Sequence, residues 1–302
     1  VSKMEIQVNG INKSFGEKQV LHDVSFRAES GKAFGLLGRN GAGKTTTIRI
    51  IMGVFREDSG EVLCDNIKVD REKLRMGYLP EERGLYPKKD VLSQLLYMAE
   101  LKGLSREQAK KNALYYLDKM AMSEYTNKKL ETLSKGNQQK IQLISVLVSD
   151  PDVIILDEPF SGLDPVNAVM LKNAVKDEIA KGKIVILSSH QMNYIEEFCE
   201  NIAIIKDGRI VLNGELEAIK KSYDRTKIAI SAEDLKAVQA QLSWDNEICG
   251  NELVVKLNSP EEKGALLEAL AKLGADINYV KVQEPSLNDI FIEYAGEEHE
   301  TV

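Results

Sequence analysis

The sequence has little of what marks extracellular, metal-binding or nucleic-acid-binding proteins. Its three cysteines, Cys64, Cys199 and Cys249, lack the spacing of a zinc site or a disulfide framework, so we expect reduced thiols in a cytosolic protein. The formal net charge of the 302 residues is −7, and no cluster of basic residues interleaved with aromatic residues is present. The electrostatic footprint of a nucleic-acid-binding protein is therefore missing, and we expect no nucleic-acid partner.

Long hydrophobic runs are also missing. The longest are short, such as Ile141–Val148, whereas a membrane span needs about 20 apolar residues in succession. The first residues, VSKMEIQVNG, lack the apolar core of a secretory signal. We therefore expect a soluble chain. Hydrophobic residues make up 43% and charged residues 29% of it, which is typical of a globular protein, and its length suits two domains.

Hydrophobic patterns predict an α/β protein with a parallel sheet. Short apolar or alternating runs predict early strands at Met4–Val8, Val24–Arg27, Ala33–Leu37 and Glu61–Cys64. The pattern then changes to a helical period over Val91–Met120, with a break at Gly103. Farther along, strands and helices alternate, as they do in a parallel sheet with crossover helices. These alternating elements are strands Val153–Leu156 and Ile184–Leu187 and helices Pro165–Ala180 and Met192–Cys199.

A second domain is predicted after a change of pattern near Lys220–Thr226. Residues 202–212 form a hairpin around an Asp-Gly turn, and from Lys227 the elements follow the order βαββαβ, which suggests a small ferredoxin-like domain. A last helix is expected at Ser286–Tyr294. We place the domains at residues 1–222 and 223–302. The elements expected in the second are Lys227–Ser231, Ala232–Leu242, Trp244–Ile248, Glu252–Leu257, Pro260–Leu273 and Ile277–Val282.

The motif GRNGAGKT, residues 38–45, matches the pattern GxxxxGK(S/T) between an apolar strand and a helical segment. Nearly bare backbone lets successive N–H groups point at phosphate oxygens, and the helix start adds partial positive charge. Lys44 is expected to reach the β- and γ-phosphates, and Thr45 to hold Mg²⁺. The expected nucleotide contacts are Gly38, Arg39, Asn40, Gly41, Ala42, Gly43, Lys44, Thr45 and Thr46.

A glycine-rich turn with a surface lysine is the alternative, but its chance occurrence in this setting is small. A phosphate-binding loop alone could belong to a GTPase, a kinase or a motor. The segment Asn127–Leu130 lacks the aspartate of a guanine-reading motif.

Two acidic residues follow a buried strand in VIILDEP, Val153–Pro159. Open α/β sheets bind ligands at the carboxyl ends of their strands, so Asp157 is expected near the phosphate loop. Asp157 then suits Mg²⁺, directly or through water, and Glu158 suits the water that attacks the γ-phosphate.

Two further segments have weaker signals. Ser134, in LETLSKGNQQK, is typical of a helix N-cap; the helix is either only capped or a second anion-binding helix start. His190, in SSH, ends the strand Ile184–Leu187 on the phosphate side. A strand-end histidine is usually structural, but this place favours a sensor of the γ-phosphate.

These elements, in this order, resemble the ATP-binding subunits of ABC transporters. The phosphate loop, LSKGN, the ILDEP strand, FSGLD at Phe160–Asp164 and His190 occur in the family's order and spacing, over about residues 4 to 220. The resemblance implies a P-loop ABC-type ATPase fold. This fold has a RecA-like parallel core, an antiparallel β subdomain and a helical subdomain at about 90–150, to which the C-terminal α+β ferredoxin-like domain is added.

The resemblance implies further roles. Phe15 matches the aromatic residue that stacks on adenine, with a core phenylalanine as the alternative. Glu81 matches a loop glutamine that contacts Mg²⁺ and senses the membrane partner. Asp164 matches a position in the loop that crosses the dimer. Ser134 and Gly136 match residues that contact the ATP held by the other subunit.

The family also implies an ATPase that hydrolyses ATP to drive transport. It would form a head-to-tail homodimer around two ATP molecules, with Glu158 and His190 as catalytic residues and with Thr45, Glu81 and Asp157 at the metal. An integral membrane permease is the implied partner, and it would hold the chain at the inner face of the cell membrane. The helical region Val91–Met120 would then receive a cytoplasmic helix of that permease.

The sequence departs from the family at four positions. Glu81 stands for glutamine, Lys135 for glycine, Asn137 for glutamine and Arg39 for proline. We interpret these as subfamily variation. YLPEERGLYP, FSGLDPVN and the C-terminal domain together resemble ATPases of two-component bacterial exporters, including sodium- and antibiotic-export systems.

Two other functions remain open from the sequence. One is a soluble ABC ATPase with a non-transport, regulatory role. The chain has one set of motifs, unlike tandem translation-factor ATPases, and Thr45 to Leu133 leaves no room for the long coiled coil of SMC-type proteins. The other is a non-enzymatic binding module, against which Glu158 speaks.

Overall fold

The computed structural model describes residues 4–82, 84–223 and 226–296. It contains two compact units, Val1–Glu215 with Phe291–Val302, and Leu216–Ile290. The sequence predicts a boundary at 222/223, whereas the packing places the helix α7 (Leu216–Ser222) in the second unit. No helix within the described ranges is both long and apolar enough to cross a membrane.

The first unit is built on a six-stranded sheet in the order β10-β9-β3-β8-β7-β6. Neighbouring strands from β9 to β6 are parallel, and β9 and β10 form an antiparallel hairpin. Every residue of β3, β7 and β8 is buried, as expected of continuous apolar strands covered on both faces. The strands are β3 (Ala33–Leu37), β6 (Met76–Leu79), β7 (Val153–Asp157), β8 (Ile184–Ser189), β9 (Asn201–Lys206) and β10 (Arg209–Glu215).

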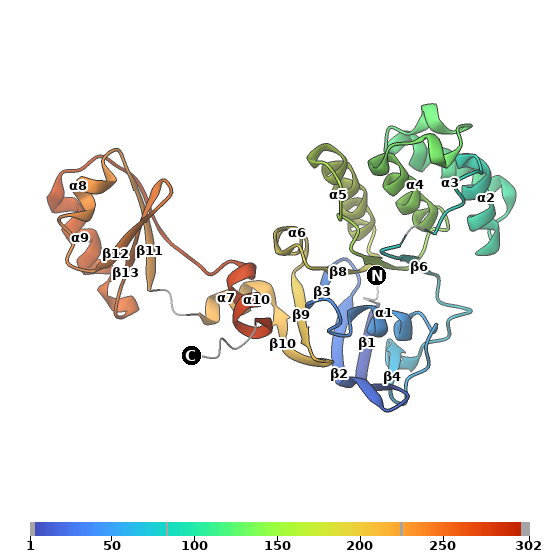
Figure 1. The fold of residues 1–302 in the computed structure, drawn as a ribbon, viewed down its shortest axis with the longest axis horizontal. Coiled ribbons are helices and arrows are strands. Elements are labelled where there is room, and N and C mark those ends of the chain that lie inside the picture. Colours follow the sequence, from blue (N-terminus) through green and yellow to red (C-terminus); the bar gives the residue numbers. More distant parts are fainter. Residues whose placement is uncertain (1–3, 83, 224–225, 297–302) are drawn as a thin grey trace. The chain divides into compact units, whose positions relative to one another are not determined.

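A second, antiparallel sheet in the order β2-β1-β4-β5 lies across the core from the parallel sheet. The helix α1 (Lys44–Ile51) lies between the two sheets, and its isoleucines join a single core with apolar residues from both. Figure 1 shows α5 (Pro165–Ala180) on the opposite face of the parallel sheet, with α6 (Met192–Phe198) beside it. The antiparallel strands are β1 (Glu5–Phe15), β2 (Lys18–Glu29), β4 (Ser59–Cys64) and β5 (Ile67–Lys68).

A group of helices forms the predicted helical subdomain. They are α2 (Val91–Leu101), α3 (Arg106–Lys119) and α4 (Lys135–Leu147), with short 3-10 turns at Ser123–Tyr125 and Leu130–Thr132. The three helices contact one another, and α4 also contacts β6. Gly103, at φ +87°, ends the first helical stretch as the sequence predicts, because a left-handed residue cannot continue a helix.

The second unit has the predicted βαββαβ order. Its antiparallel sheet has the order β12-β13-β11-β14, so the first strand lies between the third and the fourth. Apolar residues of this sheet and of its helices form a separate core. The elements are β11 (Lys227–Ala232), α8 (Leu235–Gln239), β12 (Asp245–Cys249), β13 (Glu252–Lys256), a 3-10 turn (Pro260–Glu262), α9 (Lys263–Leu273) and β14 (Ile277–Val282), and α10 (Leu287–Ala295) follows.

Candidate functional site

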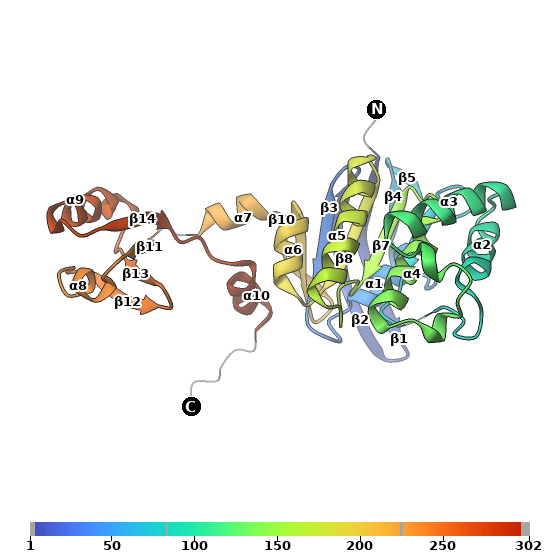
Figure 2. The ribbon, with the colours of Figure 1, turned by 90° about the horizontal axis from the view of Figure 1, so that it is seen from above.

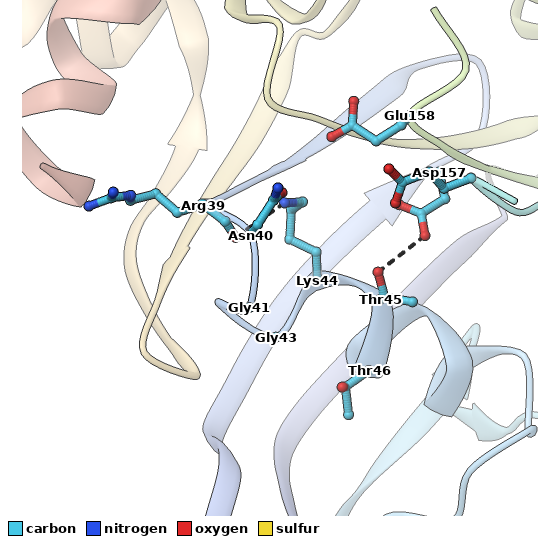
Figure 3. A pocket seen from close by; sticks show the side chains of 10 residues that line it. Arg39, Asn40, Gly41, Gly43, Lys44, Thr45, Thr46, Asp157 and Glu158 are labelled. Carbon is cyan, nitrogen blue, oxygen red and sulfur yellow. Dashed lines mark hydrogen bonds between the residues drawn. The ribbon is translucent and has the colours of Figure 1, made fainter. Parts of the chain in front are cut away.

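The glycine-rich loop connects β3 to α1 in the strand–loop–helix setting that the sequence predicts (Figure 3). Gly43 is the N-cap of α1 with φ 113°, and Gly41 has φ 82°, so both use backbone angles that favour glycine. A Cβ at Gly38 would lie 2.5 Å from the Ile205 carbonyl oxygen. The loop therefore needs glycine both for its bend and for its close approach to β9.

Lys44 is buried at the base of this loop, 7% exposed. Its Nζ donates to the carbonyl oxygens of Gly38 at 2.7 Å and of Arg39 at 3.3 Å. Burial lowers the pKa of Lys44, and nearby carboxylates, led by that of Glu158, oppose this change. The ammonium group is thus held within the loop, where a phosphate group can replace the two carbonyl contacts.

Asp157 ends β7 beside the start of α1, although it lies far from Thr45 in sequence. Thr45 Oγ1 donates to Asp157 Oδ2 at 3.2 Å, and the Tyr78 hydroxyl donates to the same oxygen at 3.4 Å. Burial and Asp157 raise the pKa of Tyr78 to about 12, so the hydroxyl stays protonated and can donate. The Ser188 hydroxyl donates to the other carboxylate oxygen, Oδ1.

The side-chain oxygen atoms of Thr45, Asp157 and Glu81 are of the kind that binds Mg²⁺. A hydroxyl, a buried carboxylate and Glu81 line the same cavity as the loop. The described residues contain no group of three or more histidine, cysteine or acidic residues arranged to hold a metal. Mg²⁺ commonly binds through one or two carboxylates together with water and substrate phosphates, so a site with few protein ligands suits it.

Glu158 lies in different surroundings from its neighbour. Its backbone has φ 50°, a left-handed angle that is rare outside glycine. Its Oε2 accepts from the Ser189 hydroxyl at 3.0 Å, and its Oε1 accepts from the His190 backbone N–H at 2.9 Å. His190 Nδ1 lies 2.8 Å from Oε1 as well. The carboxylate is therefore held against the end of β8, and Figure 3 shows it turned away from Thr45.

The cavity at the loop has a volume of about 250 Å³. We call it the nucleotide cavity. Gly38 and Ala42 do not line it: Gly38 packs against Ile205 of β9, and the Ala42 carbonyl oxygen accepts from the Gly208 N–H in the turn between β9 and β10. The residues that line the cavity are Arg39, Asn40, Gly41, Gly43, Lys44, Thr45, Thr46, Glu81, Asp157 and Glu158.

Besides Gly38 and Ala42, five predicted site residues do not line this cavity: Phe15, Ser134, Gly136, Asp164 and His190. The alternative of a core phenylalanine is wrong, because Phe15 is 45% exposed. Its ring packs edge-on against Phe55 at 5.2 Å, with the Lys13 ammonium 5.5 Å from its centroid. A partly exposed ring of this kind can stack on a flat ligand.

Ser134 caps the exposed start of α4. Its hydroxyl accepts from the Asn137 N–H at 3.3 Å, as the sequence predicts. Asp164 caps α5 by accepting from the Asn167 N–H at 3.0 Å, and it also accepts from the Asn167 side chain at 2.6 Å. A Cβ at Gly136 would lie 2.5 Å from Asn167 Nδ2. The starts of α4 and α5 therefore touch through a glycine and an asparagine.

Three residues that contact the acidic pair were not predicted from the sequence: Tyr78, Ser188 and Ser189. The signal for the two serines was present in SSH, because parallel pairing places Ser188 opposite Asp157. Tyr78 carries no such signal, since β6 itself was not predicted.

Comparison with protein families gives two matches. The ABC transporter family matches residues 21–161. The C-terminal domain of DrrA1-3-like ATP-binding proteins matches residues 214–295. Together the two families account for both the nucleotide-binding region and the accessory unit.

Similar curated proteins match over nearly the full chain. The uncharacterized ABC transporter ATP-binding protein YhaQ of Bacillus subtilis is 40% identical over 98% of this chain and 100% of its own length. The linearmycin resistance ATP-binding protein LnrL of the same species is 30% identical, covering 96% and 98%. The Nod factor export ATP-binding protein I of Paraburkholderia xenovorans is 31% identical, covering 97% of each chain.

Solved structures match the first unit in fold. An ATP-binding subunit of an ABC transporter aligns with a TM-score of 0.66 at 28% identity, covering 72% of this chain and 92% of that one. The dimeric bacterial ABC transporter cassette MJ0796 aligns with a TM-score of 0.63 at 26% identity, covering 70% and 98%.

Proposed function

Because this chain belongs to the ATP-binding, ATP-hydrolysing subunits of ABC transporters, we propose that it powers a separate membrane permease through ATP-driven dimerisation. The permease would hold it at the cytoplasmic face of the membrane. The proposed direction is export, because linearmycin resistance and Nod factor export are the activities for which two full-length relatives are named.

One observation carries the proposed dimer. The nucleotide cavity is lined by the phosphate loop, the end of β7 and Glu81, while the capped start of α4 lies outside it. Ser134 is exposed, and Gly136 leaves backbone accessible there. An exposed helix start with free N–H groups is a good anion site. A second copy in head-to-tail arrangement would bring it to the terminal phosphate.

The MJ0796 cassette is itself dimeric, which supports this arrangement for a chain of the same fold. In the proposed dimer, Asp164 lies near the seam because its helix touches the start of α4. Phe15 is proposed to stack on the adenine, since its ring is accessible at the end of β1.

Thr45, Asp157 and Glu81 are proposed to hold Mg²⁺ with the β- and γ-phosphates. The ion supplies charge that neutralises the phosphate oxygens and the negative charge that develops on them. Lys44 binds the same oxygens from the loop side. Glu81 carries a full negative charge, which strengthens attraction to the cation and repels phosphate where the cation is missing.

Glu158 is proposed to orient and deprotonate the attacking water, with His190 as its positioning partner. In the free chain the carboxylate is bound to Ser189 and His190. Closure of a second copy would exclude bulk water from this point. Hydrolysis would then remove the phosphate contacts that join the two copies, and such a ligand-dependent equilibrium can drive a partner between two states.

The first test of this function measures association. We expect Glu158→Gln to form a stable dimer with ATP, because it binds nucleotide without removing the γ-phosphate. The matched control is Lys44→Ala, which loses the phosphate contact and is expected to stay monomeric at the same ATP concentration. Size-exclusion chromatography with light scattering measures both, and a Glu158→Gln protein that remains monomeric with saturating ATP would refute the dimer mechanism.

A further inference from the structure

Glu158 and His190 are the first residues after β7 and β8. Pairing between these two strands ends with Asp157 opposite Ser188. One more backbone bond follows, from the Glu158 N–H to the Ser188 carbonyl oxygen at 3.0 Å, and the chain then turns at Glu158, whose backbone is left-handed. Beyond this point the sheet no longer fixes the two segments relative to each other, so contacts of their side chains have to do so.

Ser189 connects the second segment to the first. Its hydroxyl donates to Glu158 Oε2 at 3.0 Å and accepts from the Gln191 N–H at 3.0 Å. Gln191 is the residue directly before α6 (Met192–Phe198). The start of α6 and the Glu158 carboxylate therefore share one hydroxyl group.

Aromatic rings join the same two segments. Phe160, two residues after Glu158, is 2% exposed. Its ring stacks on that of Tyr194 in α6, with 4.5 Å between the centroids and 23° between the planes. Phe198, one helical turn after Tyr194 and therefore on the same face of α6, lies 5.5 Å from the Phe160 ring. We call Phe160, Tyr194 and Phe198 the aromatic cluster.

The helix α6 depends on such contacts for its position. It has seven residues, and a helix this short is not stable alone. Figure 2 shows it beside α5. Its Glu197 pairs with Lys172 of α5 and, at 3.8 Å, with Lys176. The Lys176 ammonium also lies 5.5 Å from the centroid of the Phe198 ring. The aromatic cluster thus joins the segment after β7 to a helix that is itself attached to α5.

We propose that Tyr194 is a positioning residue for ATP hydrolysis. By stacking on Phe160, it holds the segment that carries Glu158 against the segment that carries His190. The inference rests on the proposed function, from which it takes the roles of Glu158 and His190. It adds a residue that does not line the nucleotide cavity and acts only through these two.

Position matters here because proton transfer needs short distances. A general base must lie within about 2.6–3.2 Å of the group from which it takes a proton. Glu158 Oε1 already has such spacing to His190, with 2.8 Å to Nδ1 and 2.9 Å to the backbone nitrogen. A displacement of about 1 Å can cost about 100-fold in rate. Loss of the stack is expected to cost less, because the hydrogen bonds of Ser189 and His190 remain.

Simple core packing gives a different expectation. If the aromatic cluster only fills space, its loss lowers stability and leaves the rate constant of the folded protein unchanged. A second stacked pair in the same unit allows a matched comparison. Phe26 of β2 and Phe34 of β3 are both 2% exposed, and their ring centroids lie 4.7 Å apart with 11° between the planes. Neither residue lines the nucleotide cavity.

The first arm of the test compares Tyr194→Leu, Tyr194→Phe and Phe26→Leu in the full chain. We expect both leucine variants to lower the melting temperature by about 2–4 °C, because each loses a stacked ring. Only Tyr194→Leu is expected to lower kcat for ATP, by about tenfold with KM unchanged, whereas Tyr194→Phe keeps the ring and the wild-type kcat.

Three results of this arm would overturn the proposal: a wild-type kcat in Tyr194→Leu, an equal loss of kcat in Phe26→Leu, or a loss of kcat in Tyr194→Phe. If Tyr194→Leu does not fold, Phe198→Leu takes its place. This variant removes the other α6 ring of the cluster and is expected to lower kcat about threefold.

The second arm separates this proposal from the proposed function, by adding Tyr194→Leu to the Glu158→Gln chain. We expect the double variant to form the ATP-dependent dimer as tightly as Glu158→Gln alone, because Tyr194 lies outside the phosphate loop and the start of α4. A weaker dimer would show that the cluster supports association, and the positioning role would be wrong. If Glu158→Gln itself stays monomeric while Tyr194→Leu still lowers kcat, the dimer mechanism fails and the positioning role stands.

Discussion

Asp157 and Glu158 are neighbours in the chain, yet separate sets of partners hold their side chains. Ser188 and Thr45 bind the first carboxylate, and Ser189 and His190 bind the second. The left-handed backbone at Glu158, which costs about 1–3 kcal/mol in a non-glycine residue, turns its side chain toward β8. Two serines in succession on β8 thus direct the two carboxylates to different places.

Replacing Ser189 tests whether this arrangement matters for catalysis. We expect Ser189→Ala to lower kcat about tenfold with little change in KM for ATP, because a hydrogen bond to a charged group is worth about 1.5 kcal/mol and Ser189 lies outside the nucleotide cavity. Steady-state ATP turnover measures both constants. The control is Ser149→Ala, another buried serine, whose hydroxyl donates to the Val146 carbonyl oxygen away from the acidic pair. Equal kcat values in the two variants would contradict a positioning role.

At the scale of elements, the starts of α4 and α5 are joined by close packing. Gly136 and Asn167 touch, and Asn167 is in turn bound to the N-cap residue Asp164. A Cβ at Gly136 would overlap the Asn167 side-chain amide, so the two helix starts pack closely at this point. The residues proposed to reach the partner's nucleotide therefore belong to one packed group.

A double-mutant cycle measures this contact. We expect Gly136→Ala to destabilise the protein by about 1–3 kcal/mol, since its Cβ would overlap the Asn167 side chain. Asn167→Ala in the same chain is expected to restore part of that loss, with a coupling energy of about 0.5–3 kcal/mol in urea unfolding.

The control for this cycle is Gly264→Ala in α9. Open space surrounds this helical glycine, so we expect it to be neutral or stabilising. Additive effects of the changes at 136 and 167 would show that the two side chains do not interact.

At the scale of the whole molecule, each of the two units has a core of its own, and the last described residues belong to the first unit. Ala295 is buried, and the Gly296 carbonyl oxygen accepts from Lys206 Nζ at 2.9 Å. Lys206 is the last residue of β9, the strand that packs against the phosphate loop. The C-terminal segment is therefore part of the ATP-binding unit as well as the end of the accessory unit.

Truncation after Ser222 tests what this segment and the accessory unit contribute. We expect a lower melting temperature of the ATP-binding unit, because Lys206 loses its carbonyl partner. Lys206→Met in the full chain isolates that bond from the rest of the deletion. Dimer affinity and ATP turnover equal to those of the full chain would show that the accessory unit has no part in the ATPase cycle.

The sequence by itself determined most of the elements and the phosphate loop. Apolar runs predicted the strands β3, β7 and β8. The glycines at 41 and 43 predicted a bend, and both have positive φ angles that glycine adopts easily. These are local properties, because backbone preference and hydrophobic period depend on a residue and its neighbours. The strand β6 was not predicted, because its four residues, Met76–Leu79, are too few to show a hydrophobic period.

Only the tertiary structure decided which side chains meet. Pairing between β7 and β8 brings two serines to two acids. The fold also keeps Ser134 away from the nucleotide cavity of its own chain. Such contacts join residues far apart in sequence, and their geometry depends on how whole elements pack, which no local pattern encodes.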